Sequence, residues 1–369
     1  MKTSRLLLIA PMPPLRGGIP LHSHYLAKSL REQHNLELWA PRKLFPNFLY
    51  PGGGQFENES EREVQPLGLA HKSLSKIEIL IRLLRLSPDE FQAALVPWWT
   101  SYFTLHTIAI ATVLRLKGVA PAIFCHNVYP HYASSLDKAL SRFVVRQFQC
   151  VFVQSENEFN LVKSFHPTAK CAILNHPPYP SQPSKNHRNQ KESPADGPIR
   201  VLFFGFIREY KGIDTLLEAA QQVSRDEFHF HFVGEPWSRS LRGKIGSASE
   251  NHPHISHDMS YVGTSTLPSI FAWCDVVVLP YSQSTGSGAL ATAKGMGVPV
   301  IISDRIDPGP EFSDGRDGII FPAGDSARLA GALQQFRKNI ADFDQCWLAT
   351  EHDKGWGILA KRILDTMEL

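Results

Sequence analysis

Tyr281-Ser-Gln-Ser-Thr-Gly-Ser-Gly-Ala-Leu-Ala-Thr-Ala-Lys-Gly-Met-Gly-Val-Pro-Val-Ile301 decides the fold, because a glycine-rich turn opens a short helix that ends on glycine before a strand. The preceding run 276–279 has the composition of a fully buried strand, and Pro280 ends it. Gly286, Ser287 and Gly288 free the backbone to direct several N–H groups at an anion where the helix begins. The stretch therefore predicts a phosphate-binding turn between a strand and a helix.

A similar turn lies near the start of the chain, where Gly17 and Gly18 follow the apolar run 6–10. Helix N-termini carry partial positive charge, so each half of the chain offers a place for an anion. The chain has 369 residues, of which 43% are hydrophobic and 20% charged, a size that favours more than one domain. We therefore expect two domains with a ligand between them.

Short apolar runs alternate with longer helical patterns in both halves, which is typical of parallel sheets with helices on both faces. The predicted strands are 6–10, 36–39, 93–96, 122–125, 150–154 and 171–174 in the first half, and 199–204, 228–233, 259–262, 276–279, 300–303 and 319–321 in the second. Residues 176–198 are rich in proline and lack apolar periodicity, so they are predicted to link the domains. The expected architecture is α/β, with doubly wound domains over 1–175 and 199–354.

The five cysteines are scattered and lack CxxC spacing, which indicates a reducing compartment and no zinc site. The apolar run at the start is too short for a signal peptide and suits a first strand. The longer apolar run 102–114 is too short to cross a bilayer, and we expect it to be a buried helix.

Charge is distributed unevenly between the halves. The first 175 residues hold 19 lysines and arginines against 12 acidic residues, and the rest hold 19 against 23, which gives +7 and −4. Within the first half, the run 72–87 flanks an apolar helical pattern with basic residues. Two interpretations stay open: a packed helix with solvated charges, or a helix that lies on an anionic membrane surface.

Arg208 and Lys211 lie just beyond the predicted strand 199–204, before a helix that starts near Asp214. Ligands bind at the carboxyl ends of strands in doubly wound sheets. Two cations at that position, near the turn at Gly286, are suited to neutralise a diphosphate. The alternative is a solvated loop with Asp214 as the helix cap.

The order and spacing of these motifs resemble the retaining GT-B glycosyltransferases of family 4, which transfer a sugar from a nucleotide-sugar to an acceptor. The resemblance runs nearly end to end and rests on Gly17-Gly-Ile19, Gly205 to Gly212, Phe232-Val-Gly234, Tyr261-Val-Gly263, Pro280 to Pro299, Gly309-Pro-Glu311 and Asp314 to Gly318.

The resemblance implies two Rossmann-like domains facing a cleft, with the nucleotide mostly on the second domain and the acceptor mostly on the first. It also implies that a closing helix from about residue 355 returns to the first domain. The donor-binding residues that it implies are Gly17, Gly18, Gly205, Gly234, Glu235, Tyr261, Val262, Gly263, Ser284, Thr285, Gly286, Ser287, Gly288 and Thr292.

The chain departs from the family at two positions. The family commonly places two glutamates eight residues apart before the Gly-x-Pro-Val-Ile pattern, and this chain has Ser284 and Thr292 there. Neither side chain carries charge, so we expect backbone N–H groups of the 285–288 run to make more of the diphosphate contact. A threonine hydroxyl can still bond a ribose diol, more weakly than a carboxylate.

His126 and Asn127 follow the predicted strand 122–125, where similar enzymes keep a histidine near the donor sugar. His126, Arg208 and Lys211 are therefore the predicted catalytic residues, and Asn127 is placed on the acceptor side. Trp98 and Trp99 follow another strand and suit either an aromatic wall for an acceptor sugar or core packing. His22, His24 and His131 are interpreted as structural.

No Asp-x-Asp motif or other metal site is evident, and no cofactor is expected, because the cations of the protein take the place of a divalent ion. The sequence thus predicts a metal-independent, retaining transferase that acts on a nucleotide diphosphate-sugar and a glycan or lipid-linked acceptor. It predicts no nucleic-acid partner and a cytoplasmic location, peripheral on the inner membrane face. The alternatives are a catalytically silent relative that binds nucleotide-sugars or glycans to support a partner enzyme, and a sugar-nucleotide epimerase.

Overall fold

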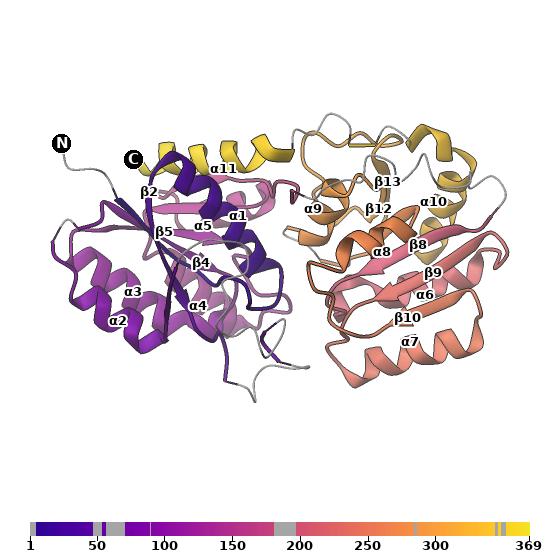
Figure 1. Ribbon diagram of the computed structural model, residues 1–369, viewed down its shortest axis with the longest axis horizontal. Helices are drawn as coiled ribbons and strands as arrows, with labels where there is room; N and C mark the ends of the chain where they lie inside the picture. The colour runs from indigo at the N-terminus through magenta and orange to yellow at the C-terminus, as the bar shows by residue number, and fades with distance from the viewer. Residues whose placement is uncertain are drawn as a thin grey trace. The chain divides into compact units, whose positions relative to one another are not determined.

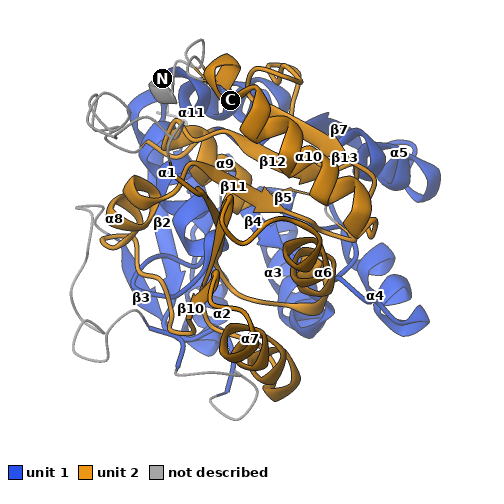
Figure 2. Cartoon of the chain, turned by 90° about the vertical axis from the view of Figure 1, so that its right-hand side faces the viewer, with its two compact units in different colours: residues 1–50, 54–177, 353–369 blue, residues 51–53, 178–352 orange. Residues whose placement is uncertain are grey.

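The computed structural model describes residues 5–46, 54–56, 71–88, 90–180, 197–283, 286–343, 346–347 and 352–369. These residues divide into two compact units (Figure 2). Unit 1 lies within residues 1–50, 54–177 and 353–369, and unit 2 lies within residues 178–352. Most of the predicted linker, residues 181–196, lies outside the described residues.

Unit 1 contains a parallel sheet of 7 strands in the order β3-β2-β1-β4-β5-β6-β7. Its strands are β1 (Arg5–Ile9), β2 (Asn35–Pro41), β3 (Lys72–Leu74), β4 (Ala93–Trp98), β5 (Ala120–Cys125), β6 (Cys150–Val153) and β7 (Lys170–Ile173). The central strands are apolar and buried because helices cover the sheet on both faces. The chain reverses its winding between β1 and β4, which is the switch point of a doubly wound sheet.

The helices of unit 1 are α1 (Gly18–Gln33), α2 (Lys76–Leu84), α3 (Thr104–Leu116), α4 (Ser135–Val145), α5 (Glu156–Phe165) and α11 (His352–Met367). Helix α2 contacts α3, and α3 contacts α4, so these three helices follow one another along the sheet (Figure 1). The terminal helix α11 packs on α1, where the ring of Trp356 lies 5.5 Å from that of Tyr25.

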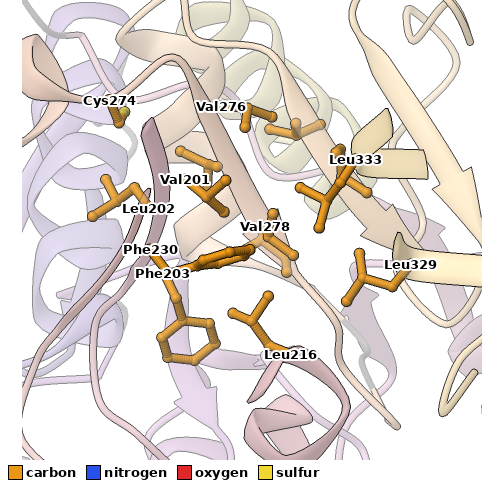
Figure 3. Close-up of a cluster of buried hydrophobic side chains, with 14 of the residues drawn as sticks. Val201, Leu202, Phe203, Leu216, Phe230, Cys274, Val276, Val278, Leu329 and Leu333 are labelled. Atoms are coloured by element: carbon orange, nitrogen blue, oxygen red, sulfur yellow. The ribbon is translucent and has the colours of Figure 1, made fainter. Parts of the chain in front are cut away.

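Unit 2 contains a parallel sheet of 6 strands in the order β10-β9-β8-β11-β12-β13. Its strands are β8 (Ile199–Phe204), β9 (Phe228–Val233), β10 (Ile255–Asp258), β11 (Val276–Leu279), β12 (Val300–Ser303) and β13 (Gly318–Phe321). The helices are α6 (Ile213–Gln222), α7 (Arg239–Asn251), α8 (Leu267–Trp273), α9 (Gly288–Gly295) and α10 (Ser326–Lys338). Apolar side chains of β8, β9 and β11 pack against α6 and α10 in one core (Figure 3).

Two predictions, for the runs 259–262 and 102–114, need correction. The run 259–262 is not a strand; the strand lies earlier, at Ile255–Asp258, and 259–262 belong to the loop that follows it. Within the run 72–87, the predicted helical pattern is confirmed as α2, and β3 at Lys72–Leu74 precedes it. The run 102–114 is not fully buried, since Leu105 at the start of α3 is 84% exposed.

The capping of α2 explains where that helix begins. The Ser75 side chain accepts the backbone N–H of Glu78, and the Glu78 carboxylate accepts the backbone N–H of Ser75. This reciprocal capping box satisfies N–H groups that have no partner within the helix. The Ser-x-x-Glu spacing that forms this box is visible in the sequence, and β3 ends at Leu74, the residue before the cap.

All five cysteines are free. Within the described parts of the chain, no helix combines the length and the apolar character needed to cross a bilayer.

Candidate functional site

The switch point of the unit 2 sheet lies between the neighbouring strands β8 and β11. Because the two strands are parallel, the loops at their carboxyl ends meet at one edge of the sheet. The backbone N–H of Ser282 donates to the carbonyl of Tyr210 over 2.8 Å, and the Ser282 hydroxyl donates to the same oxygen over 3.1 Å. The loop that carries Arg208 and Lys211 is therefore bonded to the loop that leads into α9.

Gly212 makes this close approach possible. Its φ of +71° lies in the left-handed region, and a Cβ atom there would lie 1.8 Å from the carbonyl oxygen of Pro280. Only glycine fits without moving one loop away from the other. The glycine after Lys211 thus sets the distance between the two halves of the candidate site.

Lys211 extends across the carboxyl end of β8 and is 8% exposed. A Cβ atom at Gly205 would lie 3.4 Å from its Nζ, so the ammonium group lies over the Gly205 backbone. The same Nζ lies 5.3 Å from the ring centre of Tyr281. Burial, together with the nearby positive charge of Arg208, lowers the pKa of Lys211 to about 7.

Arg208 is held by an aromatic side chain. Its guanidinium carbon lies 4.1 Å from the ring centre of Trp237, a cation–π geometry that fixes the side chain after β8. The Nε atom is buried without a hydrogen-bond partner. Among the residues that the structure describes, neither Arg208 nor Lys211 forms an ion pair, so two neighbouring cations lack an anion here.

Helix α9 begins at the end of the second loop, which follows β11. Ser287 caps the helix by accepting the backbone N–H of Leu290, and it also forms a side-chain hydrogen bond with Tyr281. Tyr281 therefore touches both Lys211 and the helix cap. Gly286 is exposed beside the cap, whereas the predicted donor residues Ser284 and Thr285 lie outside the described residues.

Thr292 lies inside α9 and is 7% exposed. Its hydroxyl donates to the carbonyl of Gly288 over 2.8 Å, one helical turn earlier. The hydroxyl proton is thus used within the helix, which leaves only the oxygen lone pairs to meet a ligand hydroxyl. Thr292 can therefore form fewer hydrogen bonds with a ribose diol than the sequence alone indicated.

The remaining predicted donor residues of unit 2 lie at the same edge of the sheet. Gly234 ends β9 with a φ of +144°, and a Cβ atom there would lie 2.0 Å from the carbonyl oxygen of Gly205. Glu235 accepts the backbone N–H of Ile207 through its carbonyl. Tyr261, Val262 and Gly263 follow the carboxyl end of β10, and the Tyr261 ring lies 5.5 Å from that of Phe206.

In unit 1, Gly17 precedes α1 with a φ of +112°, and Gly18 begins the helix without a side-chain cap. His126 follows β5 and is 9% exposed. Burial lowers its pKa to about 3, with a further contribution from His176, so its imidazole is neutral at pH 7. A neutral imidazole donates one hydrogen bond and accepts another, which suits contact with sugar hydroxyls.

The sequence interpretation did not connect His22 with His126. The two rings meet edge to face at 4.7 Å, and the rings of His176 and Trp356 each lie 5.0 Å from His22. Both ring nitrogens of His22 are buried without a partner in the described part of the chain. These contacts join residues far apart in sequence, and no local pattern predicts them.

Trp98 is too deeply buried to form a wall for an acceptor, whereas Trp99 is half-buried. Trp98 is 1% exposed, and its indole N–H donates to the carbonyl of Val128 over 3.2 Å. The Trp98 carbonyl accepts the backbone N–H of His126 over 2.8 Å. Trp99 packs against Phe103 at 4.9 Å. Core packing is thus the observed role of Trp98, and it holds the segment that carries His126 and Asn127.

Glu158 holds the same segment from another side. This carboxyl group of α5 is 3% exposed and accepts the backbone N–H of Val128 over 2.6 Å. Burial raises its pKa to about 7, although the backbone hydrogen bonds from Val128 and Gln154 act in the opposite direction. Glu158 is therefore a positioning residue for the segment after β5.

Glu158→Gln tests this position through the pH dependence of stability. The folded state of the wild type holds a proton with a pKa of about 7, above the value of about 4.3 in the unfolded chain, so its stability falls as pH rises between these values. Glutamine keeps an acceptor for Val128 and removes the titration. From pH 5 to pH 8 the free energy of unfolding should shift in favour of the variant by about 2–3 kcal/mol, measured by urea titration. An equal difference at both pH values would contradict the assignment.

No group of three or more histidine, cysteine or carboxylate side chains placed to hold a metal ion occurs among the residues that the structure describes.

The two doubly wound parallel sheets define the class of protein, and the chain has the GT-B fold of glycosyltransferases. Anabaena HepE in complex with UDP-glucose matches with a TM-score of 0.68 and 13% identity over 99% of this chain and 97% of that chain. An identity this low carries the fold alone. The predicted fold class is confirmed.

Residues 198–339 match the family described as Glycosyl transferases group 1, in agreement with the family resemblance. GDP-mannose:glycolipid 4-beta-D-mannosyltransferase of Xanthomonas campestris is 32% identical over 149 residues, covering 38% of this chain and 41% of that protein. Phosphatidyl-myo-inositol mannosyltransferase of Mycobacterium leprae is 32% identical over 143 residues, covering 38% of this chain and 37% of that protein. The chain thus matches about two fifths of the length of these relatives.

Proposed function

We propose that this protein is a glycosyltransferase that moves a sugar from a nucleotide diphosphate-sugar to a glycan or glycolipid acceptor without a metal ion. The observation that carries the proposal is the pair of cations, Arg208 and Lys211, at the switch point of the unit 2 sheet. The residues that form this sheet match a glycosyltransferase family. Neither cation has a carboxylate partner among the described residues. A diphosphate supplies the missing negative charge.

The leaving nucleotide sets the chemistry of this site. As the bond from the anomeric carbon to the diphosphate breaks, negative charge grows on the phosphate oxygens, where Lys211, Arg208 and the N-terminus of α9 stabilise it. Because the pKa of Lys211 is about 7 without a ligand, a bound diphosphate raises it and favours uptake of a proton near neutral pH. The protein thereby supplies positive charge without a divalent ion.

We propose retention of configuration by same-face substitution, as the family resemblance implies. The acceptor oxygen bonds to the anomeric carbon while the carbon–phosphate oxygen bond breaks, and the hydroxyl proton passes to the leaving phosphate. Neutral His126 is proposed to hydrogen-bond a donor-sugar hydroxyl. The second possible stereochemical outcome is inversion. It is considered because the name of the Xanthomonas relative specifies a beta linkage, which an alpha-linked donor yields by inversion.

We further propose that the acceptor is lipid-linked and that the protein works at the cytoplasmic face of a membrane. The names of two relatives specify a glycolipid and a phosphatidylinositol as acceptors. No nucleic-acid partner is proposed.

A donor panel tests the proposal. GDP-mannose is tried first because both relatives are named as mannosyltransferases, followed by other GDP-, UDP- and ADP-sugars with glycolipid acceptors. We expect transfer from one donor, undiminished in EDTA, with the anomeric configuration read from the one-bond carbon–hydrogen coupling of the product. Loss of transfer in EDTA would overturn metal independence.

The second candidate function is a catalytically silent relative that binds a nucleotide-sugar or glycan in support of a partner enzyme. The uncharged Thr292, whose hydroxyl bonds within α9, is the observation that favours it. Tight binding of a nucleotide without turnover across the donor panel would establish this candidate, and transfer from any donor would exclude it.

A further inference from the structure

Unit 1 exposes large apolar side chains on three successive helices. Leu105 and Leu116 of α3 are 84% and 78% exposed, and Ile77 of α2 is 71% exposed. Similar side chains continue the set at Ile81 and Leu84 of α2 and at Leu136 and Phe143 of α4. An isolated exposed leucine is ordinary, but a set on adjoining helices indicates a surface that meets something apolar.

The spacing places each set on one side of its helix. Ile77, Ile81 and Leu84 are four and then three residues apart, whereas Ile79 and Leu83 between them are buried. Leu136 and Phe143 are two turns apart on α4. Since α2 contacts α3 and α3 contacts α4, the exposed sides belong to one stretch of surface, here named the α2–α4 face (Figure 1).

The same helices carry many basic side chains. The three helices with their C-terminal caps carry eight lysines and arginines, at positions 76, 82, 85, 115, 117, 138, 142 and 146. They carry two acidic residues, Glu78 and Asp137, and both are held in capping boxes. Arg82, Arg85 and Lys138 form no ion pair with a described carboxylate, so their charge is available to a partner.

We propose that the α2–α4 face docks on a bilayer that contains anionic phospholipid. Apolar side chains enter the boundary between headgroups and acyl chains, and the lysines and arginines bind the lipid phosphates. Protein interfaces are depleted of charge at their centres, whereas the helices that form this face carry eight cations beside the exposed apolar side chains. A nucleic acid would match the charge and leave the leucines and isoleucines exposed to water.

This inference rests on the proposed function only in that a lipid-linked acceptor gives the face a purpose. Its test needs no donor and no turnover, so its failure and the failure of the transferase proposal are separate results. The probe is a set of vesicles made of phosphatidylcholine, alone or with phosphatidylglycerol, and the readout is sedimentation of the full chain with the vesicles.

We expect the chain to bind the vesicles that contain phosphatidylglycerol and to release them as salt rises. R82E/R85E/K138E should lower the partition onto these vesicles at least about a hundredfold, since each basic residue near an anionic surface contributes to binding. The matched control R225E/R239E/K338E makes the same change of charge at exposed positions of unit 2 and should bind like the parent.

One further variant, I77S/L105S, tests the contribution of the apolar side chains. I77S/L105S should bind the vesicles more weakly than the parent does, and the difference should be clearest at high salt, where the attraction between charges is screened. Equal binding of parent and R82E/R85E/K138E, or equal binding to neutral and anionic vesicles, would overturn the proposal. A dimer in sedimentation equilibrium that I77S/L105S dissociates would also overturn it, because a second copy would then cover the face.

Discussion

Replacing Arg208 and Lys211 together with alanine is expected to lower kcat/KM for the nucleotide-sugar by about 10²- to 10⁴-fold. Each cation is proposed to make charge-assisted contacts with the diphosphate, worth about 1.5–3 kcal/mol apiece. The overall fold should remain, because neither residue forms an ion pair with a described carboxylate. Steady-state kinetics with the donor identified by the panel, together with circular dichroism, measures both parts.

Lys211→Met separates the loss of charge from the loss of volume. The wild type should gain stability as pH rises from about 7 toward the value of about 10.4 in the unfolded chain, because only the unfolded lysine still holds its proton there. In Lys211→Met this rise of stability with pH should be absent, and the free-energy cost of burying an ammonium group is also removed. Lys338→Ala, at an exposed position on α10, is the control and should leave both kinetics and stability unchanged. Transfer by the double alanine variant at the parental rate would refute the diphosphate assignment.

Gly212→Ala is expected to destabilise unit 2 by about 2–6 kcal/mol. The estimate combines about 1–3 kcal/mol for overpacking with about 1–3 kcal/mol for a non-glycine residue in the left-handed region. The new Cβ would lie 1.8 Å from the Pro280 carbonyl oxygen, so the loops after β8 and β11 must separate. Donor turnover should fall with stability, measured by thermal unfolding and by kinetics below the transition.

Gly243→Ala is the matched control for that substitution. Gly243 lies inside α7, and a Cβ atom there would meet no atom within 4 Å. Alanine in a helix interior should raise stability by about 0.5–1 kcal/mol. Equal effects of the two substitutions would mean that Pro280 does not constrain Gly212.

The buried strands were predictable because burial makes them rich in apolar residues, as an unbroken run in β11 and as alternating phenylalanines in the first part of β9. The predicted bounds of β8, β9, β11 and β12 match the observed ones. Two edge strands, β3 and β10, were not predictable in this way, whereas the edge strands β7 and β13 lie within one residue of their predicted positions. β3 and β10 each have one neighbouring strand, and the polar residues Lys72, Ser256, His257 and Asp258 occupy them. For β10 the apolar residues that follow in the loop produced the wrong assignment.

The candidate site was predictable where glycine controls it. Gly205, Gly212 and Gly234 all have positive φ, and backbone oxygens lie where Gly212 and Gly234 would carry Cβ atoms. Side chains that act across elements left no local pattern. Tyr281 links Lys211 to the α9 cap, and Glu158 holds Val128 from 30 residues away.

A calorimetric titration of GDP and UDP into the wild type and Lys211→Met tests the diphosphate assignment most directly. We expect the nucleotide that binds the wild type to bind Lys211→Met about 10- to 100-fold more weakly. Titration of the wild type in buffers of different ionisation enthalpy should show proton uptake above pH 7, as the bound diphosphate raises the pKa of Lys211 from about 7. Equal affinity of the two proteins, with no proton uptake, would contradict the account.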